Sequence, residues 1–149
     1  MVVDPNINIT LPTAVFKLVE TAQNTDREVY RWSTVAVAKY RNTLVEGWNS
    51  NKTSPKYFYE HKESDYEKHS AYNRHAEAHL LQQLDPAWDR RKIKIFVCRI
   101  NKAGEISMAK PCPSCQIKLS REGILAKNIY YTNREGVWVN LGSYDHCHG

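Results

Sequence analysis

The stretch KIKIFVCRI, residues 92–100, decides the fold class of this chain. Its apolar and charged side chains alternate, with Ile93, Ile95 and Val97 set against Lys94 and Arg99. Such alternation is the period of a β-strand, and the run ends at a turn over residues 102–104. We therefore predict a strand here and expect it to lie centrally in a sheet.

The segments on both sides of this strand complete an α/β pattern. Helical spacing of apolar residues predicts helices over residues 12–24, 75–84 and 113–123. Apolar and β-branched runs predict further strands over residues 33–39, 43–48, 128–132 and 137–141. The connection between the last two strands is too short for a parallel return, so these strands are predicted to form an antiparallel hairpin. Residues 49–73 lack a sustained apolar stripe and are predicted to be a long connection.

Length and composition restrict the class of protein. The 149 residues fit a single domain spanning residues 1–149. A hydrophobic content of 42% with 25% charged residues is typical of soluble globular proteins. The sequence shows neither an apolar run of about 18 residues nor a signal segment, so we expect a cytoplasmic protein (in the host cytoplasm if viral) with no membrane partner. The net charge of +5 favours anionic partners such as nucleotides or nucleic acid.

Two short motifs carry the chemistry. The tripeptide HAE, residues 75–77, opens one predicted helix, and PCPSC, residues 111–115, leads into another. Together they satisfy the H-x-E…P-C-x-x-C signature of zinc deaminases. Cysteines three residues apart on the first turn of a helix share one face, and the helix N-terminus stabilises their thiolates. Cys112, Cys115 and His75 are therefore predicted to hold one zinc ion with a fourth position open, as in catalytic zinc sites.

Glu77 lies two residues from a predicted ligand and is not itself expected to bind the metal. Zinc lowers the pKa of bound water to about 7, which makes hydroxide available to attack a cytosine-type ring. Glu77 is predicted to take the proton of this water, deliver it to the ring nitrogen and then protonate the departing amine.

A structural zinc site remains an alternative. Cys112 and Cys115 could also close a tetrahedron with ligands from the tail, residues 145–148. In that case His75 and Glu77 would be ordinary surface residues.

With these motifs the chain resembles the cytidine deaminase-like superfamily over residues 33–141. Residues 47–49 resemble the G-x-N element of deoxycytidylate deaminases and bacterial tRNA adenosine deaminases, and residues 49–55 resemble a loop of phage deoxycytidylate deaminase-like proteins. The resemblance implies a three-layer α/β/α fold with a five-stranded mixed sheet, whose two zinc-bearing helices lie side by side on one face. The antiparallel final hairpin resembles the free-cytidine branch instead, so topology and the G-x-N element point to different branches.

The resemblance also implies substrate contacts. Asn49 would touch the base or sugar, the backbone amide of Ala76 would bind the base carbonyl, and the carbonyl of Lys110 would face the leaving amine. Lys52 and Thr53 could meet the sugar end of a free nucleotide. The chain lacks the extra cysteine and histidine ligands that some viral deoxycytidylate deaminases use for a second zinc, so one zinc ion per chain is expected.

These features predict hydrolytic deamination of cytosine in a free cytidine or deoxycytidine nucleotide or nucleoside, giving the uracil product and ammonia. The basic and aromatic residues in 48–62, with residues 90–92, also fit a single-stranded DNA or RNA substrate. A non-catalytic zinc-binding protein is the third hypothesis. The sequence leaves open whether adenine or guanine replaces cytosine, the phosphate state of the substrate and the formation of a homo-oligomer.

Overall fold

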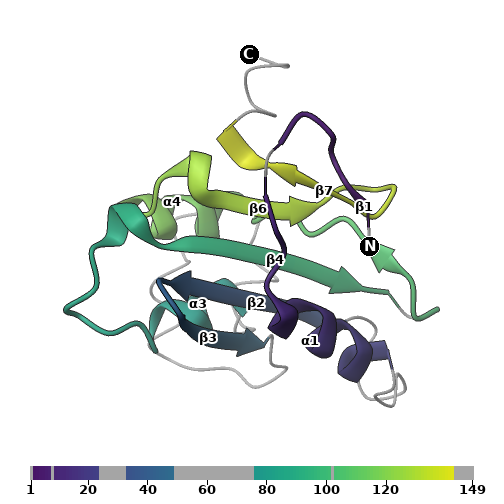
Figure 1. The fold of residues 1–149 in the computed structure, drawn as a ribbon, viewed down its shortest axis with the longest axis horizontal. Coiled ribbons are helices and arrows are strands. Elements are labelled where there is room, and N and C mark those ends of the chain that lie inside the picture. Colours follow the sequence, from purple (N-terminus) through teal and green to yellow (C-terminus); the bar gives the residue numbers. More distant parts are fainter. Residues whose placement is uncertain (1, 8, 24–32, 49–75, 102, 143–149) are drawn as a thin grey trace.

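The computed structural model describes residues 2–7, 9–23, 33–48, 76–101 and 103–142. They form an α/β fold around one mixed sheet of seven strands (Figure 1). The strands are β1 (Val2–Val3), β2 (Ser33–Tyr40), β3 (Thr43–Trp48), β4 (Lys94–Ile100), β5 (Ile106–Ser107), β6 (Ile129–Thr132) and β7 (Val137–Asn140). The helices are α1 (Thr13–Gln23), α3 (Ala76–Leu81) and α4 (Pro113–Arg121), with short 3-10 turns at η3 (Arg90–Lys92) and η4 (Ala126–Asn128).

Strand β4 lies inside the sheet, as its sequence predicts. The strand order is β1-β7-β6-β4-β2-β3, and β5 pairs with β4. β4 runs antiparallel to β2 and parallel to β6. β6 and β7 pair antiparallel, which confirms the hairpin expected from their short connection.

The sheet has two more strands than the five expected. β1 pairs with β7 in parallel, and β5 pairs with the end of β4 after the turn that follows it. Each contains two residues, too few to leave an alternating pattern in the sequence. Helix α3 is also shorter than predicted: it ends at Leu81, while Leu84 beyond it is still buried. The apolar spacing therefore continued past the helix itself.

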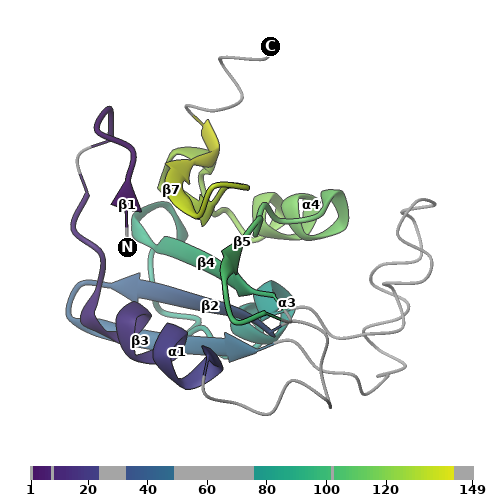
Figure 2. The same ribbon diagram turned by 90° about the vertical axis from the view of Figure 1, so that its right-hand side faces the viewer.

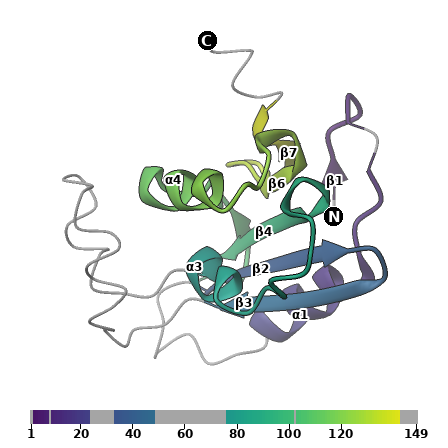
Figure 3. The ribbon, with the colours of Figure 1, turned by 90° about the vertical axis from the view of Figure 1, so that its left-hand side faces the viewer.

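Helices cover both faces of the sheet (Figure 2). On one face, Val15 and Val19 of α1 pack with Val35, Val37 and Phe96 of the strands. We call this the α1 face. The other face, the α3/α4 face, carries both remaining helices, as the view from the opposite side shows (Figure 3). Its core combines residues of α3, α4 and four strands, among them Leu80, Leu119, Ala36, Val97 and Tyr131.

A glycine lets α3 lie directly on β3. A Cβ atom at Gly47 would lie 2.5 Å from the carbonyl oxygen of Ala76 and 2.8 Å from the backbone nitrogen of Leu80. No larger residue fits between the two backbones without movement. Gln83 adds a second attachment, because its side-chain amide donates to the carbonyl of Glu46 at 2.7 Å. One contact at the start of α3 and one just past its end thus hold the helix on the edge strand β3.

No helix in the described ranges combines the length and apolar character needed to cross a membrane.

Candidate functional site

The two predicted cysteine ligands lie at the start of α4. Cys112 is the N-cap residue, with φ −64° and ψ 161°, and its sulfur accepts a hydrogen bond from the backbone N–H of Cys115 at 3.4 Å. Pro113 occupies the first turn, where its missing N–H costs nothing. Cys115 is buried and Cys112 partly buried. The PCPSC sequence therefore brings both sulfurs to one helix end, as its spacing predicts.

Hydrogen bonds hold the segment that leads into α4. The side-chain amide of Gln116 donates to the carbonyl of Pro111 at 2.8 Å. Upstream, the N–H of Ala109 donates to the carbonyl of Thr132 at 2.9 Å, and the hydroxyl of Thr132 donates to the carbonyl of Ser107 at 2.7 Å. The segment is thus tied to both α4 and β6. The side chain of Lys110 within it is exposed, and the predicted role of its carbonyl stays a prediction.

Glu77 lies in the first turn of α3 and is buried, with 5% of its surface exposed. An ionised carboxylate is costly to bury unless other groups compensate its charge. Its neighbour Ala76 is fully buried against β3. The close contact at Gly47 therefore sets where the carboxylate lies.

Glu77 of α3 and the cysteines at the start of α4 lie close together where the two helices contact each other. α3 and α4 contact each other on the α3/α4 face. A hydrogen bond with Cys112, burial and the nearby charge of Glu77 raise the pKa of the Cys115 thiol well above its ordinary value. A bound cation would oppose this effect, because a coordinated thiol loses its proton. Residues separated by 35 or more positions in the sequence thus share one site.

Arg99 lies near the candidate site, and the sequence did not single it out. Burial lowers the pKa of its guanidinium, and the charge of Glu77 acts in the opposite direction. The side chain is half-buried near the end of β4. The alternation of Ile95, Val97 and Arg99 was a signal for its position, since it puts the three on one face of the strand.

Cys98 is kept apart from this site. It lies in the core of the α1 face and is fully buried. Burial raises the pKa of its thiol to about 12, despite a hydrogen bond with Thr132. Cys98 is therefore an inert core thiol.

The donor set fits a zinc ion. Two sulfurs with a carboxylate beside them suit zinc, which binds Cys, His and carboxylate ligands. In the described ranges no group of three or more His, Cys, Asp or Glu residues is placed to hold a metal, so the two cysteines need a further ligand. The predicted one, His75, directly precedes α3 and lies outside the described residues.

Other predicted contacts also lie outside the described residues. They are the substrate contacts Asn49, Lys52 and Thr53. The predicted connection over residues 49–73 and the tail at 145–148, which could supply alternative zinc ligands, also lie outside them.

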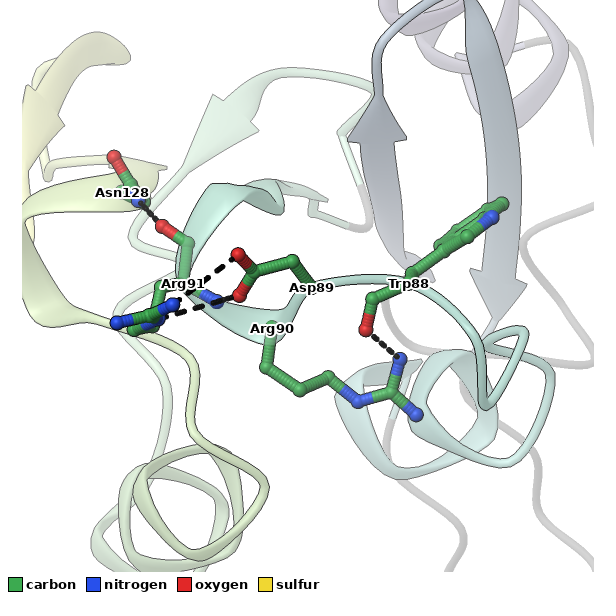
Figure 4. A network of polar contacts seen from close by, with 5 residues as sticks. All are labelled: Trp88, Asp89, Arg90, Arg91 and Asn128. Atoms are coloured by element: carbon green, nitrogen blue, oxygen red, sulfur yellow. Dashed lines mark hydrogen bonds and ion pairs between the residues drawn. The ribbon is translucent and has the colours of Figure 1, made fainter.

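The arginines at η3, one element of the possible nucleic-acid surface, have structural partners (Figure 4). Arg90 donates to the carbonyls of Asp85 and Trp88 at 2.8 and 3.4 Å. Arg91 pairs with Asp89 at 3.4 Å, and its carbonyl accepts from the side chain of Asn128 at 2.9 Å. These contacts join η3 to the segment before it and to Asn128 of η4.

Comparison of the chain with protein-family models, curated proteins and solved structures finds no match.

Proposed function

We propose that this chain is a zinc-dependent deaminase that hydrolyses a cytosine base to uracil and ammonia. The observation that carries the proposal is the buried carboxylate of Glu77 next to Cys115, where α3 and α4 meet on one face of the sheet. A helix that begins with HAE and a helix that begins with PCPSC are the two halves of the zinc-deaminase signature. In the folded chain their described residues are neighbours.

Each residue has a chemical role in this proposal. Cys112 and Cys115, with His75, would hold the zinc. Zinc, when bound, would supply a Lewis acid that makes water nucleophilic at neutral pH. The carboxylate of Glu77 would accept a proton from the attacking water and pass it to the ring nitrogen. It would then take the remaining proton, from the hydroxyl now bonded to the ring carbon, and give it to the amine, so that ammonia leaves as the C–N bond breaks and the C=O bond of uracil forms. Its burial keeps the transferred proton away from bulk water.

The burial of Glu77 favours an enzyme over a structural zinc protein. If Cys112 and Cys115 bound a purely structural zinc with the tail, Glu77 would be expected on the surface. It is 5% exposed and faces Cys115 instead. A buried carboxylate beside a buried thiol is costly for stability, and functional sites are where such costs are usually found.

The finer fold and substrate assignments belong to the same proposal. Five of the seven strands would form the sheet of the three-layer cytidine deaminase-like fold, with two-residue strands added beside β7 and β4. The antiparallel β6–β7 hairpin supports the branch that acts on free cytidine, so we favour a free nucleotide or nucleoside over single-stranded nucleic acid. Asn49, Lys52 and Thr53 are the proposed contacts to that substrate. A cytoplasmic location remains a prediction.

The test compares zinc-loaded protein with its Glu77→Gln variant. Both are incubated with cytidine, deoxycytidine, their mono- and triphosphates and a mixed-sequence single-stranded DNA, and deamination is followed by mass spectrometry. We expect wild-type protein to convert at least one nucleoside or nucleotide, and the variant to lose at least 10²-fold in kcat while keeping its zinc. An exposed carboxylate, as in Glu105→Gln, is the matched control and should leave turnover unchanged.

Conversion of DNA alone would keep the chemistry and replace the substrate. An active Glu77→Gln variant would refute the proposed role of this carboxylate. Loss of zinc on removal of Cys147 or His148, without any deamination by the wild type, would establish the structural-zinc alternative.

A further inference from the structure

A row of polar side chains crosses the sheet near the strand ends that lie close to Glu77. On the α3/α4 face, β4 presents Ile95 and Val97 and then Arg99. The cross-strand partners of Arg99 are Thr34 on β2 and Ser107 on β5. Directly opposite residues in an antiparallel pair point to the same side of the sheet. The α3/α4 face is therefore apolar beneath the two helices and becomes polar at the strand ends, where α3 and α4 begin.

Arg99 lies within reach of the charge of Glu77. The guanidinium is half-buried, and a buried cation is tolerated only near compensating negative charge. The strand register places the start of α3 near Arg99, because Ala36 pairs with both Gly47 and Val97, Ala76 packs on Gly47, and Arg99 follows Val97 on the same face of β4. Among the described residues, Glu77, next to Ala76, contributes a negative charge that acts on Arg99. Glu77 in turn lies beside Cys115. Arginine, carboxylate and thiol thus follow one another from the sheet to the start of α4.

We propose that Arg99 is a positioning residue for Glu77, holding its carboxylate in place from the sheet side while the cysteines lie on the other side. The proposal rests on the catalytic role proposed for Glu77. With zinc bound, two thiolates and one carboxylate would carry one more negative charge than Zn²⁺ neutralises, and Arg99 would supply the missing positive charge. Arginine suits the task because its planar guanidinium stays charged and binds carboxylates in a fixed geometry.

The first experiment measures kcat and KM of zinc-loaded Arg99→Met and Arg99→Lys. Because the substitution frees Glu77 to move away from the reacting atoms, we expect kcat of Arg99→Met to fall on the order of 10²-fold with KM little changed. Lysine restores the charge without the planar geometry and should recover part of the loss. Arg134→Met, at an exposed arginine in the β6–β7 turn, is the matched control and should behave as wild type. Zinc content should stay the same in all variants.

The second experiment does not depend on activity. Melting temperatures of the zinc-loaded wild type, Arg99→Met, Glu77→Gln and the double variant form a double-mutant cycle. If the two side chains interact, the shift of the double variant differs from the sum of the single shifts. The same cycle with Arg134→Met in place of Arg99→Met should be additive. If Arg99→Met fails to fold, Arg99→Lys takes its place in the cycle.

Additive shifts for Arg99 and Glu77 would overturn the proposal. Unchanged kcat in Arg99→Met would also overturn it, and a raised KM with unchanged kcat would show that Arg99 binds substrate instead. If the wild type deaminates nothing, the proposed function fails, while non-additive shifts would still establish the contact between the two side chains.

Discussion

The two ends of β4 carry arginines in opposite environments. Arg90 and Arg91 precede the strand at η3, where Arg91 is exposed and pairs with Asp89 (Figure 4). Arg99 lies near the far end of the strand, half-buried and close to Glu77. Only about 16 Å of extended chain separates the start of β4 from Arg99. The same side chain thus makes a surface contact at one end and joins a buried polar site at the other.

The difference follows from what covers each end of the strand. At the Arg99 end, α3 and α4 begin above the sheet and exclude water from Glu77 and Cys115. At the η3 end the charged groups remain partly in water, where an ion pair is weak. Both ends carry arginine, so the residue type does not distinguish them. Burial does, because only the arginine at the Arg99 end lies beside groups that could take part in catalysis, while those at η3 have a structural role.

Among the substitutions that test this difference between the two ends of β4, Gly47→Ala should have the largest effect on stability and activity. Its Cβ would lie 2.5 Å from the carbonyl oxygen of Ala76, so α3 has to shift and carry Glu77 with it. We expect a loss of about 1–3 kcal/mol in the free energy of unfolding, together with a large loss of deamination. Denaturant unfolding and the mass-spectrometric assay measure the two.

Gly104→Ala is the control for this change. Gly104 has φ +83° and no atom within 4 Å of an added Cβ, so it should lose about 1–2 kcal/mol from backbone strain alone and keep its activity. A Gly47→Ala variant as stable and active as the wild type would show that α3 does not depend on this contact.

A smaller effect, on the pH dependence of the free energy of unfolding, distinguishes the two faces of β4. Cys98 follows Val97 and precedes Arg99 but points into the α1 face, where burial raises the pKa of its thiol to about 12. The unfolded chain releases this proton near the ordinary value of 9.0, while the folded chain keeps it. Between these values the unfolded state binds fewer protons, so the free energy of unfolding falls as pH rises, by up to about 1.4 kcal/mol per unit.

Cys98→Ala should remove that part of the pH dependence. Unfolding at pH 8, 9 and 10 in both proteins measures it, and the contributions of Cys112 and Cys115 cancel in the difference. Parallel curves for the two proteins would mean that the Cys98 thiol ionises as readily in the folded chain as in the unfolded one.

The smallest effect is expected from Arg91→Ala at the other end of the strand. Its pairing with the partly exposed Asp89 lowers the pKa of that carboxyl, but solvent screens the interaction. We expect unfolding and deamination to stay within experimental error of the wild type. A loss of activity comparable to that of Arg99→Met would mean that the two ends of β4 are not functionally distinct.

Local patterns predicted much of the fold. Alternation identified β4, the short connection fixed the antiparallel β6–β7 hairpin, and Pro113 after Cys112 marked the start of α4. The two-residue strands β1 and β5 were missed because they exist only through pairing with β7 and β4. The sequence predicted Glu77 and the cysteines as site residues, whereas nothing in it joined Arg99 to them.

The sequence by itself determined the periodicity of the main strands, the two motifs and the chemistry available to their side chains. The tertiary structure decided which of these groups are buried together. Glu77, Arg99 and Cys115 belong to three elements, and their proximity depends on strand register and on the contact of α3 with β3 at Gly47. Local propensity carries no information about such long-range contacts, because only packing of the whole sheet and its helices creates them.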